Sequence, residues 1–169
     1  IDVLQDEVSK VNSDYLIVDT PGQIELFAFR TSGPFLVQNL DAEEKVNIFL
    51  YDGALITSAV NFVSIALLAT SIKLRLNIST INVITKTDLI SSKMKEILQW
   101  STNLRTLEAA ILNESDGETY TLITNILRGL NIGGFAQGLF PISNVTGEGM
   151  INLQSALSRI INLGEEVED

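Results

Sequence analysis

The segment Asp-Thr-Pro-Gly-Gln at residues 19–23 combines residue types that suit chemistry on a phosphate group. It follows the apolar run at residues 15–18, which predicts a buried strand that ends at Asp19. Ligands of open α/β sheets bind at the carboxyl ends of the strands, so Asp19 could hold Mg²⁺ there. The backbone N–H of Gly22 could face a terminal phosphate, and Gln23 could orient an attacking water. The competing interpretation is an ordinary strand–turn–helix junction in which the aspartate caps the helix.

A second polar segment, Thr-Lys-Thr-Asp at residues 85–88, follows the apolar run at residues 81–84. Thr85 takes the place of the first residue of Asn-Lys-x-Asp, a motif that recognises guanine. The carboxylate of Asp88 could accept hydrogen bonds from N1–H and N2–H of guanine, a pair of donors that adenine does not offer. The stem of Lys86 could pack on the face of the base. The competing interpretation is a helix N-cap at Asp88 or Ser91 beside a solvated lysine.

The third segment, Ser-Asn-Val-Thr-Gly-Glu-Gly at residues 143–149, follows the last apolar run, residues 139–142. Guanine nucleotide hydrolases place here a loop whose backbone amides contact the base oxygen. Ser143 and Asn144 match its first positions, although no lysine follows. Taken singly, the segment is also typical of a polar strand–helix loop with glycine turns. The order of phosphate sensor, base reader and base loop, each after an apolar run, favours a guanine nucleotide site.

The chain alternates between strand-like apolar runs and longer helical segments. The predicted strands are residues 15–19, 46–51, 81–85 and 139–142. They are almost continuously apolar, which is typical of strands buried on both faces of a parallel sheet. The predicted helices are residues 27–40 as two short helices broken at Gly33-Pro34, 57–76, 92–113 as one or two helices, 119–130, and 147–163 with Gly164 as C-cap. This alternation predicts an α/β fold with right-handed crossovers, in which the helical block at residues 91–131 is an insertion and a candidate partner surface.

Composition excludes several other kinds of site. The sequence has no Cys and no His, which rules out disulfides, zinc sites of Cys or His, Ser-His-Asp triads and cysteine nucleophiles. The net charge of −10 disfavours nucleic acids and anionic membranes as partners. The longest apolar stretch, residues 60–72, is shorter than the about 20 residues of a membrane span, so we expect a cytoplasmic protein. Glu114, Asp116 and Glu118 lie in a polar break and indicate a solvated loop rather than a metal site.

Taken together, these motifs resemble the GPN-loop GTPase family. The matching segments are residues 19–27, 61–64 with 75–76, 81–89 and 143–149, and the similarity covers about residues 15–157. The resemblance implies a three-layer, P-loop NTPase-like α/β fold with a mostly parallel sheet and helices on both faces. It also implies binding of GTP and GDP with Mg²⁺, hydrolysis of GTP, and a homodimer that forms around its nucleotide. Eukaryotic members are associated with RNA polymerase assembly and nuclear import, whereas archaeal members form simpler homodimers.

The resemblance assigns roles to individual residues. Asp19 matches the aspartate that holds the metal through a water, Gly22 matches the γ-phosphate sensor, and Gln23 matches the residue that positions the attacking water. The residues that match the guanine nucleotide site are Thr85, Lys86, Thr87, Asp88, Ser143, Asn144 and Val145. The implied chemistry is in-line attack by water, accelerated by positioning and charge stabilisation.

Two hallmarks of the family, the phosphate loop Gly-x-x-x-x-Gly-Lys-Ser/Thr and the Gly-Pro-Asn loop, do not occur in the sequence, and Ser79 takes the place of a usual proline. In P-loop folds the strand that feeds the phosphate loop lies between the strands predicted at residues 15–19 and 46–51. Without it, their buried N–H and C=O groups lack partners, at a cost of about 1–3 kcal/mol each. We therefore expect residues 1–169 to be the C-terminal portion of a single GTPase domain, with both loops upstream of Ile1 and negligible GTP hydrolysis by the chain itself.

Two other functions fit the same motifs. A non-catalytic GTPase-like module that binds or scaffolds other proteins would carry them as relics. An ATPase of related fold would share the sheet and the phosphate sensor, but it would not need an aspartate that reads guanine.

Overall fold

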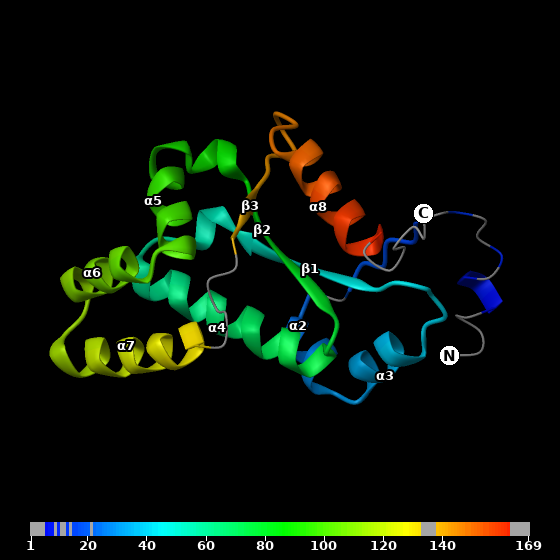
Figure 1. The fold of residues 1–169 in the computed structure, drawn as a ribbon, viewed down its shortest axis with the longest axis horizontal. Coiled ribbons are helices and arrows are strands. Elements are labelled where there is room, and N and C mark those ends of the chain that lie inside the picture. Colours follow the sequence, from blue (N-terminus) through cyan, green and yellow to red (C-terminus); the bar gives the residue numbers. More distant parts are fainter. Residues whose placement is uncertain are drawn as a thin grey trace, which may run out of the picture.

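The computed structural model describes residues 6–8, 10, 13, 15–20, 22–132 and 138–162. Its strands are β1 (Val46–Asp52), β2 (Ser79–Thr85) and β3 (Phe140–Pro141). Its helices are α2 (Ile24–Phe29), α3 (Ser32–Asn39), α4 (Ala59–Leu76), α5 (Ser91–Thr102), α6 (Leu104–Glu114), α7 (Gly117–Ile132) and α8 (Met150–Asn162), arranged as in Figure 1. Two short 3-10 turns, η1 (Gly53–Leu55) and η2 (Thr87–Leu89), follow β1 and β2.

The three strands of the described residues form one parallel sheet in the order β1-β2-β3. Val46 pairs with Ser79 and Asp52 pairs with Thr85, so β1 and β2 are aligned along their whole length. The pairing of β2 with β3 is short and includes Ile84 with Pro141. Because all three strands run the same way, the loops that follow them leave from the same edge of the sheet. The predicted parallel sheet is confirmed for these strands.

Helices cover both faces of this sheet (Figure 1). On one face, Phe49 and Tyr51 of β1 pack with α4 in a core that also contains Trp100 of α5. On the other face, Ile81 and Val83 of β2 pack with Ala156 of α8. The strands of an α/β fold are shielded in this way by helices on each side. The predicted three-layer architecture is therefore confirmed.

Helix α4 is the long apolar helix predicted at residues 57–76. It begins where Ser58 accepts a hydrogen bond from the N–H of Asn61, and it ends at Asn77, which adopts the left-handed conformation. By length and composition alone, α4 is long and apolar enough to span a membrane. The sequence indicates a shorter apolar stretch, residues 60–72, below that length. In the structure, however, α4 packs on β1, β2, α2, α3, α5 and α6, which is the setting of a core helix.

The prediction of a strand at residues 15–19 is wrong. These residues form no strand and their side chains are exposed; the exposed fraction of Ile17 is 92%. A strand exists only where a neighbour pairs with its N–H and C=O groups, and within the described residues the sheet ends at β1. The prediction that β1 is buried on both faces is also only half right. Its residues Ile48 and Leu50 point away from α4 and remain exposed, Leu50 to 59%, because α8 covers only part of that face.

Several helix ends differ from the prediction for local reasons. The break between α2 and α3 falls at Arg30 and Thr31, while Gly33-Pro34 lies in the first turn of α3. Proline is tolerated there because first-turn N–H groups have no partner within the helix. The segment predicted as one or two helices at residues 92–113 forms two, α5 and α6, because Asn103 accepts hydrogen bonds from the first N–H groups of α6. The predicted C-cap at Gly164 lies outside the described residues.

Candidate functional site

The residues predicted to read guanine lie in a sharp turn after β2. Lys86 adopts the left-handed conformation (φ 58°, ψ 37°), which is uncommon for a residue other than glycine. The chain then enters η2, which carries Thr87 and Asp88. The following helix α5 has Ile90 as its N-cap and no side-chain cap. The competing interpretation, in which Asp88 or Ser91 is the N-cap of the helix, is therefore wrong.

The loop after β3 is joined directly to this turn. Ser143 is fully buried, and its Oγ donates a hydrogen bond of 2.6 Å to Oδ1 of Asp88. The backbone N–H of Thr87 also donates to the carbonyl of Ile142, at 3.3 Å. Two segments whose bonded residues are 55 positions apart in sequence thus form one site at the carboxyl edge of the sheet. The structure brings together the predicted base reader and the predicted base loop.

Hydrogen bonds within the base loop fix its shape. The Oγ of Ser143 accepts from the N–H groups of Val145 and Thr146, each at 3.2 Å. Gly147 and Gly149 both have positive φ, and a Cβ on Gly149 would collide with the carbonyl of Pro141. The loop therefore turns tightly around Ser143 and leaves the side chains of Asn144 and Val145 exposed at its tip.

Asp52, at the end of β1, is a further charged residue of the site that none of the predicted motifs contains. Its Oδ2 lies 2.6 Å from Nζ of Lys86, and its Oδ1 accepts a hydrogen bond from the N–H of Ala54 at 3.0 Å. The hydrogen bond from Lys86 lowers the pKa of the Asp52 carboxyl below its usual range. The sequence signal for Asp52 was its position, because it directly follows an apolar run as Asp19 does.

The two threonines of the base-reading segment have different surroundings. Thr85 stands where asparagine is usual, and its Oγ1 donates to the carbonyl of Tyr51 at 3.3 Å. This bond ties the ends of β1 and β2 together. Thr87 is buried, and its Oγ1 has no hydrogen-bond partner among the residues described by the structure.

The segment predicted to sense the phosphate is not joined to the base-reading loops. Asp19, Gly22 and Gln23 are exposed, and a Cβ on Gly22 would have no atom within 4 Å. Among the described residues, no hydrogen bond or ion pair links any of the three to residues 85–88 or 143–149. The N-cap of α2 is Gln23, without a side-chain cap, so the interpretation of Asp19 as a helix cap is also wrong.

Comparison with known proteins identifies the family. The model of a family described as "Conserved hypothetical ATP binding protein" matches residues 1–163. GPN-loop GTPase 3 of Dictyostelium discoideum is 30% identical over 176 residues, which cover 99% of this chain and 60% of that protein. GPN-loop GTPase 3 of Saccharomyces cerevisiae is 33% identical over 125 residues, covering 69% of this chain and 43% of that protein. The chain belongs to the GPN-loop GTPase family.

A solved structure of similar architecture supports the fold of this GPN-loop GTPase family member. The crystal structure of a GTPase from Pyrococcus abyssi in its apo form superposes with a TM-score of 0.71 at 22% identity, over 94% of this chain and 64% of that chain. At that identity the similarity establishes the fold alone. The chain spans about 60% of the length of its Dictyostelium relative.

The donors present fit a Mg²⁺ ion in part. Where phosphate oxygens and waters complete its coordination shell, Mg²⁺ takes one or two carboxylates from the protein. Asp19 is an exposed carboxylate with no partner among the described residues, so it suits that role. Within the same residues, no group of three or more acidic side chains gathers to hold a metal without a phosphate.

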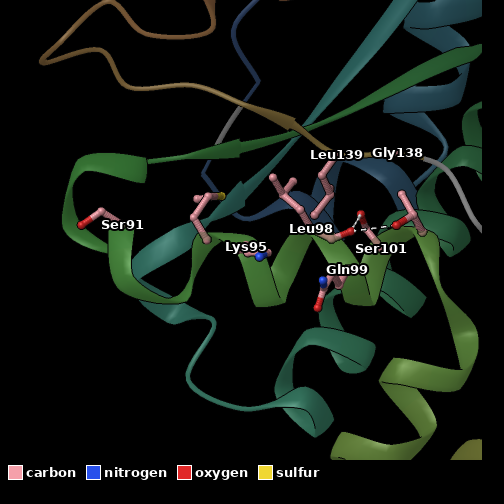
Figure 2. Close-up of a pocket in the computed structure, with 9 residues that line it drawn as sticks. Ser91, Lys95, Leu98, Gln99, Ser101, Gly138 and Leu139 are labelled. Atoms are coloured by element: carbon pink, nitrogen blue, oxygen red, sulfur yellow. Dashed lines mark hydrogen bonds between the residues drawn. The ribbon is translucent and has the colours of Figure 1, made fainter.

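A shallow groove lies beside the site of this family member but does not contain it. The groove runs between α5 and the start of β3 and is lined by the apolar side chains of Met94, Leu98 and Leu139 (Figure 2). None of the residues predicted from the motifs lines it. The candidate nucleotide site is therefore an open edge formed by loops, not this groove.

Proposed function

We propose that the protein binds GTP and hydrolyses it to GDP and phosphate. The observation that carries this proposal is the placement of Asp88, which is held by the buried Ser143 and lies two residues after Lys86 at the carboxyl edge of the sheet. One oxygen of Asp88 is fixed by the serine, and the other has no partner among the described residues. A carboxylate held in this way suits two adjacent N–H donors on one edge of a base, which guanine has and adenine lacks.

The same proposal assigns the hydrolytic step to residues 19–23. Asp19 would hold Mg²⁺, which supplies positive charge beside the β- and γ-phosphates when bound. The N–H of Gly22 would donate to a γ-phosphate oxygen, and Gln23 would orient the attacking water. Water attacks the γ-phosphorus as the bond to the β-phosphate oxygen breaks, which leaves GDP and inorganic phosphate. Because these residues are exposed and separate from the base-reading loops, we expect them to move when nucleotide binds.

A comparison of nucleotides tests the base assignment in the full-length protein. The change Asp88→Asn removes the charged acceptor, so we expect GTP to bind roughly 10- to 100-fold more weakly. The amide N–H of the asparagine complements the O2 of xanthine, so XTP should gain affinity in the variant. The matched control is Asp116→Asn, because Asp116 is an exposed aspartate that caps α7 far along the chain. An unchanged preference for GTP over ATP in Asp88→Asn contradicts the guanine assignment.

A second function is a non-catalytic GTPase-like module that binds nucleotide or scaffolds partners. The separation of Asp19 and Gln23 from the base-reading loops favours it, since hydrolysis requires both parts on one nucleotide. Measurement of phosphate release distinguishes the two functions. Release that falls in the variants Asp19→Asn and Gln23→Ala supports the GTPase, whereas tight binding without release supports the scaffold.

The family resemblance further supports a dimeric switch in the assembly of protein complexes such as RNA polymerase, acting in the cytoplasm. Light scattering of the full-length protein with GDP or a non-hydrolysable GTP analogue tests the dimer. A mass that stays at one copy in both states contradicts this part of the proposal.

A further inference from the structure

We infer that Asp52 is a positioning residue for base recognition. It holds the side chain of Lys86 in the conformation in which its apolar stem can pack on guanine. This inference rests on the proposed guanine site, and it adds a residue that none of the sequence motifs contains. The two residues come from different strands, β1 and β2, whose ends are in register. The site thus depends on the alignment of two strands as well as on its own loop.

Lys86 and Asp88 are each held by a residue that follows a neighbouring strand, and the proposed place of the base lies between them. Nζ of Lys86 lies 2.6 Å from Asp52, so the lysine stem spans from the end of β2 toward the end of β1. Asp88 is fixed on the other side, by Ser143 after β3. Lys86 and Asp88 are only two residues apart, yet they are held in opposite directions across the edge of the sheet. The space above the end of β2 is therefore flanked by an apolar stem and a carboxylate, the two groups that guanine recognition requires.

Both oxygens of Asp52 are used, which makes it a rigid anchor. Oδ1 accepts from the N–H of Ala54 and so caps the turn η1, while Oδ2 faces the lysine. The turn η1 also lies close against the end of β2. A Cβ on Gly53 would lie only 2.5 Å from the carbonyl of Thr85. Glycine at this position lets the two strand ends approach closely, and the carboxylate consequently sits within reach of Lys86.

A role in stability alone does not account for this ion pair. The side chain of Lys86 is 52% exposed and that of Asp52 is 33% exposed. Ion pairs with such exposure contribute little to folding, because solvent screens the charges and the long side chains lose rotamer entropy. The same loss of entropy is useful at a binding site, since a lysine that is already ordered loses less freedom when the base packs on its stem.

The test is a comparison of GDP binding by Asp52→Asn and wild-type full-length protein. Asparagine can still accept from Ala54 through Oδ1, but it then turns its NH₂ group toward Lys86 and releases the lysine. We expect GDP to bind about two- to tenfold more weakly, the effect of ordering one long side chain. The KM for GTP should rise with an unchanged kcat, because the contact is made to the base and not to the reacting phosphate.

A double-mutant cycle separates positioning from a structural role. Lys86→Met keeps an apolar stem but removes the ammonium group, so Asp52→Asn should cause no further loss of GDP affinity in that background. Equal losses in both backgrounds, or a loss of folding in Asp52→Asn, overturn the inference. The matched control is Glu108→Gln, which breaks the 3.1 Å ion pair with Arg128 and should leave binding unchanged.

The outcomes also distinguish this inference from the proposed function. If the wild-type protein binds no guanine nucleotide, both the proposed function and this inference are wrong. If Asp88→Asn abolishes the preference for guanine while Asp52→Asn binds GDP like the wild type, the inference alone fails.

Discussion

Ser143 and Asp88 are joined by a 2.6 Å hydrogen bond between the loops that follow β3 and β2. The serine hydroxyl donates to the carboxylate and accepts from the N–H groups of Val145 and Thr146. One buried oxygen thus fixes both the aspartate that would read the base and the loop that would close over it. Such a bond to a charged acceptor is stronger than one between neutral groups.

We predict that Ser143→Ala impairs both stability and nucleotide binding. The change leaves the backbone N–H groups of Val145 and Thr146 without their acceptor at a partly buried place, and it releases the carboxylate of Asp88. The free energy of unfolding should fall by about 1–3 kcal/mol, and GDP should bind more weakly. Denaturant unfolding and fluorescence titration measure the two effects. The control is Ser155→Ala on α8, where an exposed serine bonds only to its own helix and both values should stay near those of the wild type.

We predict opposite effects for two glycine-to-alanine changes. Gly149 has φ 80°, and a Cβ there would collide with the carbonyl of Pro141, so Gly149→Ala should destabilise the protein by more than about 1 kcal/mol. Gly129 lies inside α7 with open space around its Cβ position, so Gly129→Ala should stabilise it by about 0.5–1 kcal/mol. The midpoints of thermal unfolding measure both. A Gly149→Ala variant as stable as the wild type contradicts the tight turn after Ser143.

The parallel sheet and the helices could be predicted because their signals are local. The apolar run at residues 46–51 and the long, mostly apolar segment of α4 are visible in the sequence and recur in the structure. The run at residues 15–18 has the same character but forms no strand, since a strand depends on a neighbour that composition does not reveal.

Within the candidate site, the motifs predicted the residues that lie next to each other in sequence but not their distant partners. Asp52 meets Lys86 only through the register of β1 and β2, 34 residues apart in sequence. Glu114 was expected to lie in a solvated loop, yet its carboxylate accepts hydrogen bonds from the first N–H groups of α4. Both roles depend on tertiary contacts, for which a single sequence carries no periodic signal.

The contact of Glu114 with α4 predicts a measurable loss of stability. Its Oε1 accepts from Ala59 at 3.0 Å and its Oε2 from Val60 at 3.1 Å, so the side chain caps a helix that begins 55 residues earlier. Glu114→Ala should lower the free energy of unfolding by about 1–2 kcal/mol, because two N–H groups and the positive end of the helix lose their partner. Glu114→Gln should lower the free energy of unfolding by about half as much, because the amide keeps one acceptor oxygen but no charge. Glu96→Ala, at an exposed position on α5, is the control and should have little effect.

The ion pair between Asp52 and Lys86 predicts a shifted titration. The hydrogen bond from Lys86 lowers the folded-state pKa of Asp52 below the unfolded value of about 3.9. The stabilisation from this group is therefore present above about pH 4, and it is lost as the pH falls through the folded-state pKa. NMR titration of the Asp52 carboxyl carbon should give a midpoint below that unfolded-state value. In Lys86→Met the midpoint of Asp52 should rise toward the ordinary value, because the largest cause of its shift is gone; a midpoint that does not move would show that the lysine is not its partner in solution.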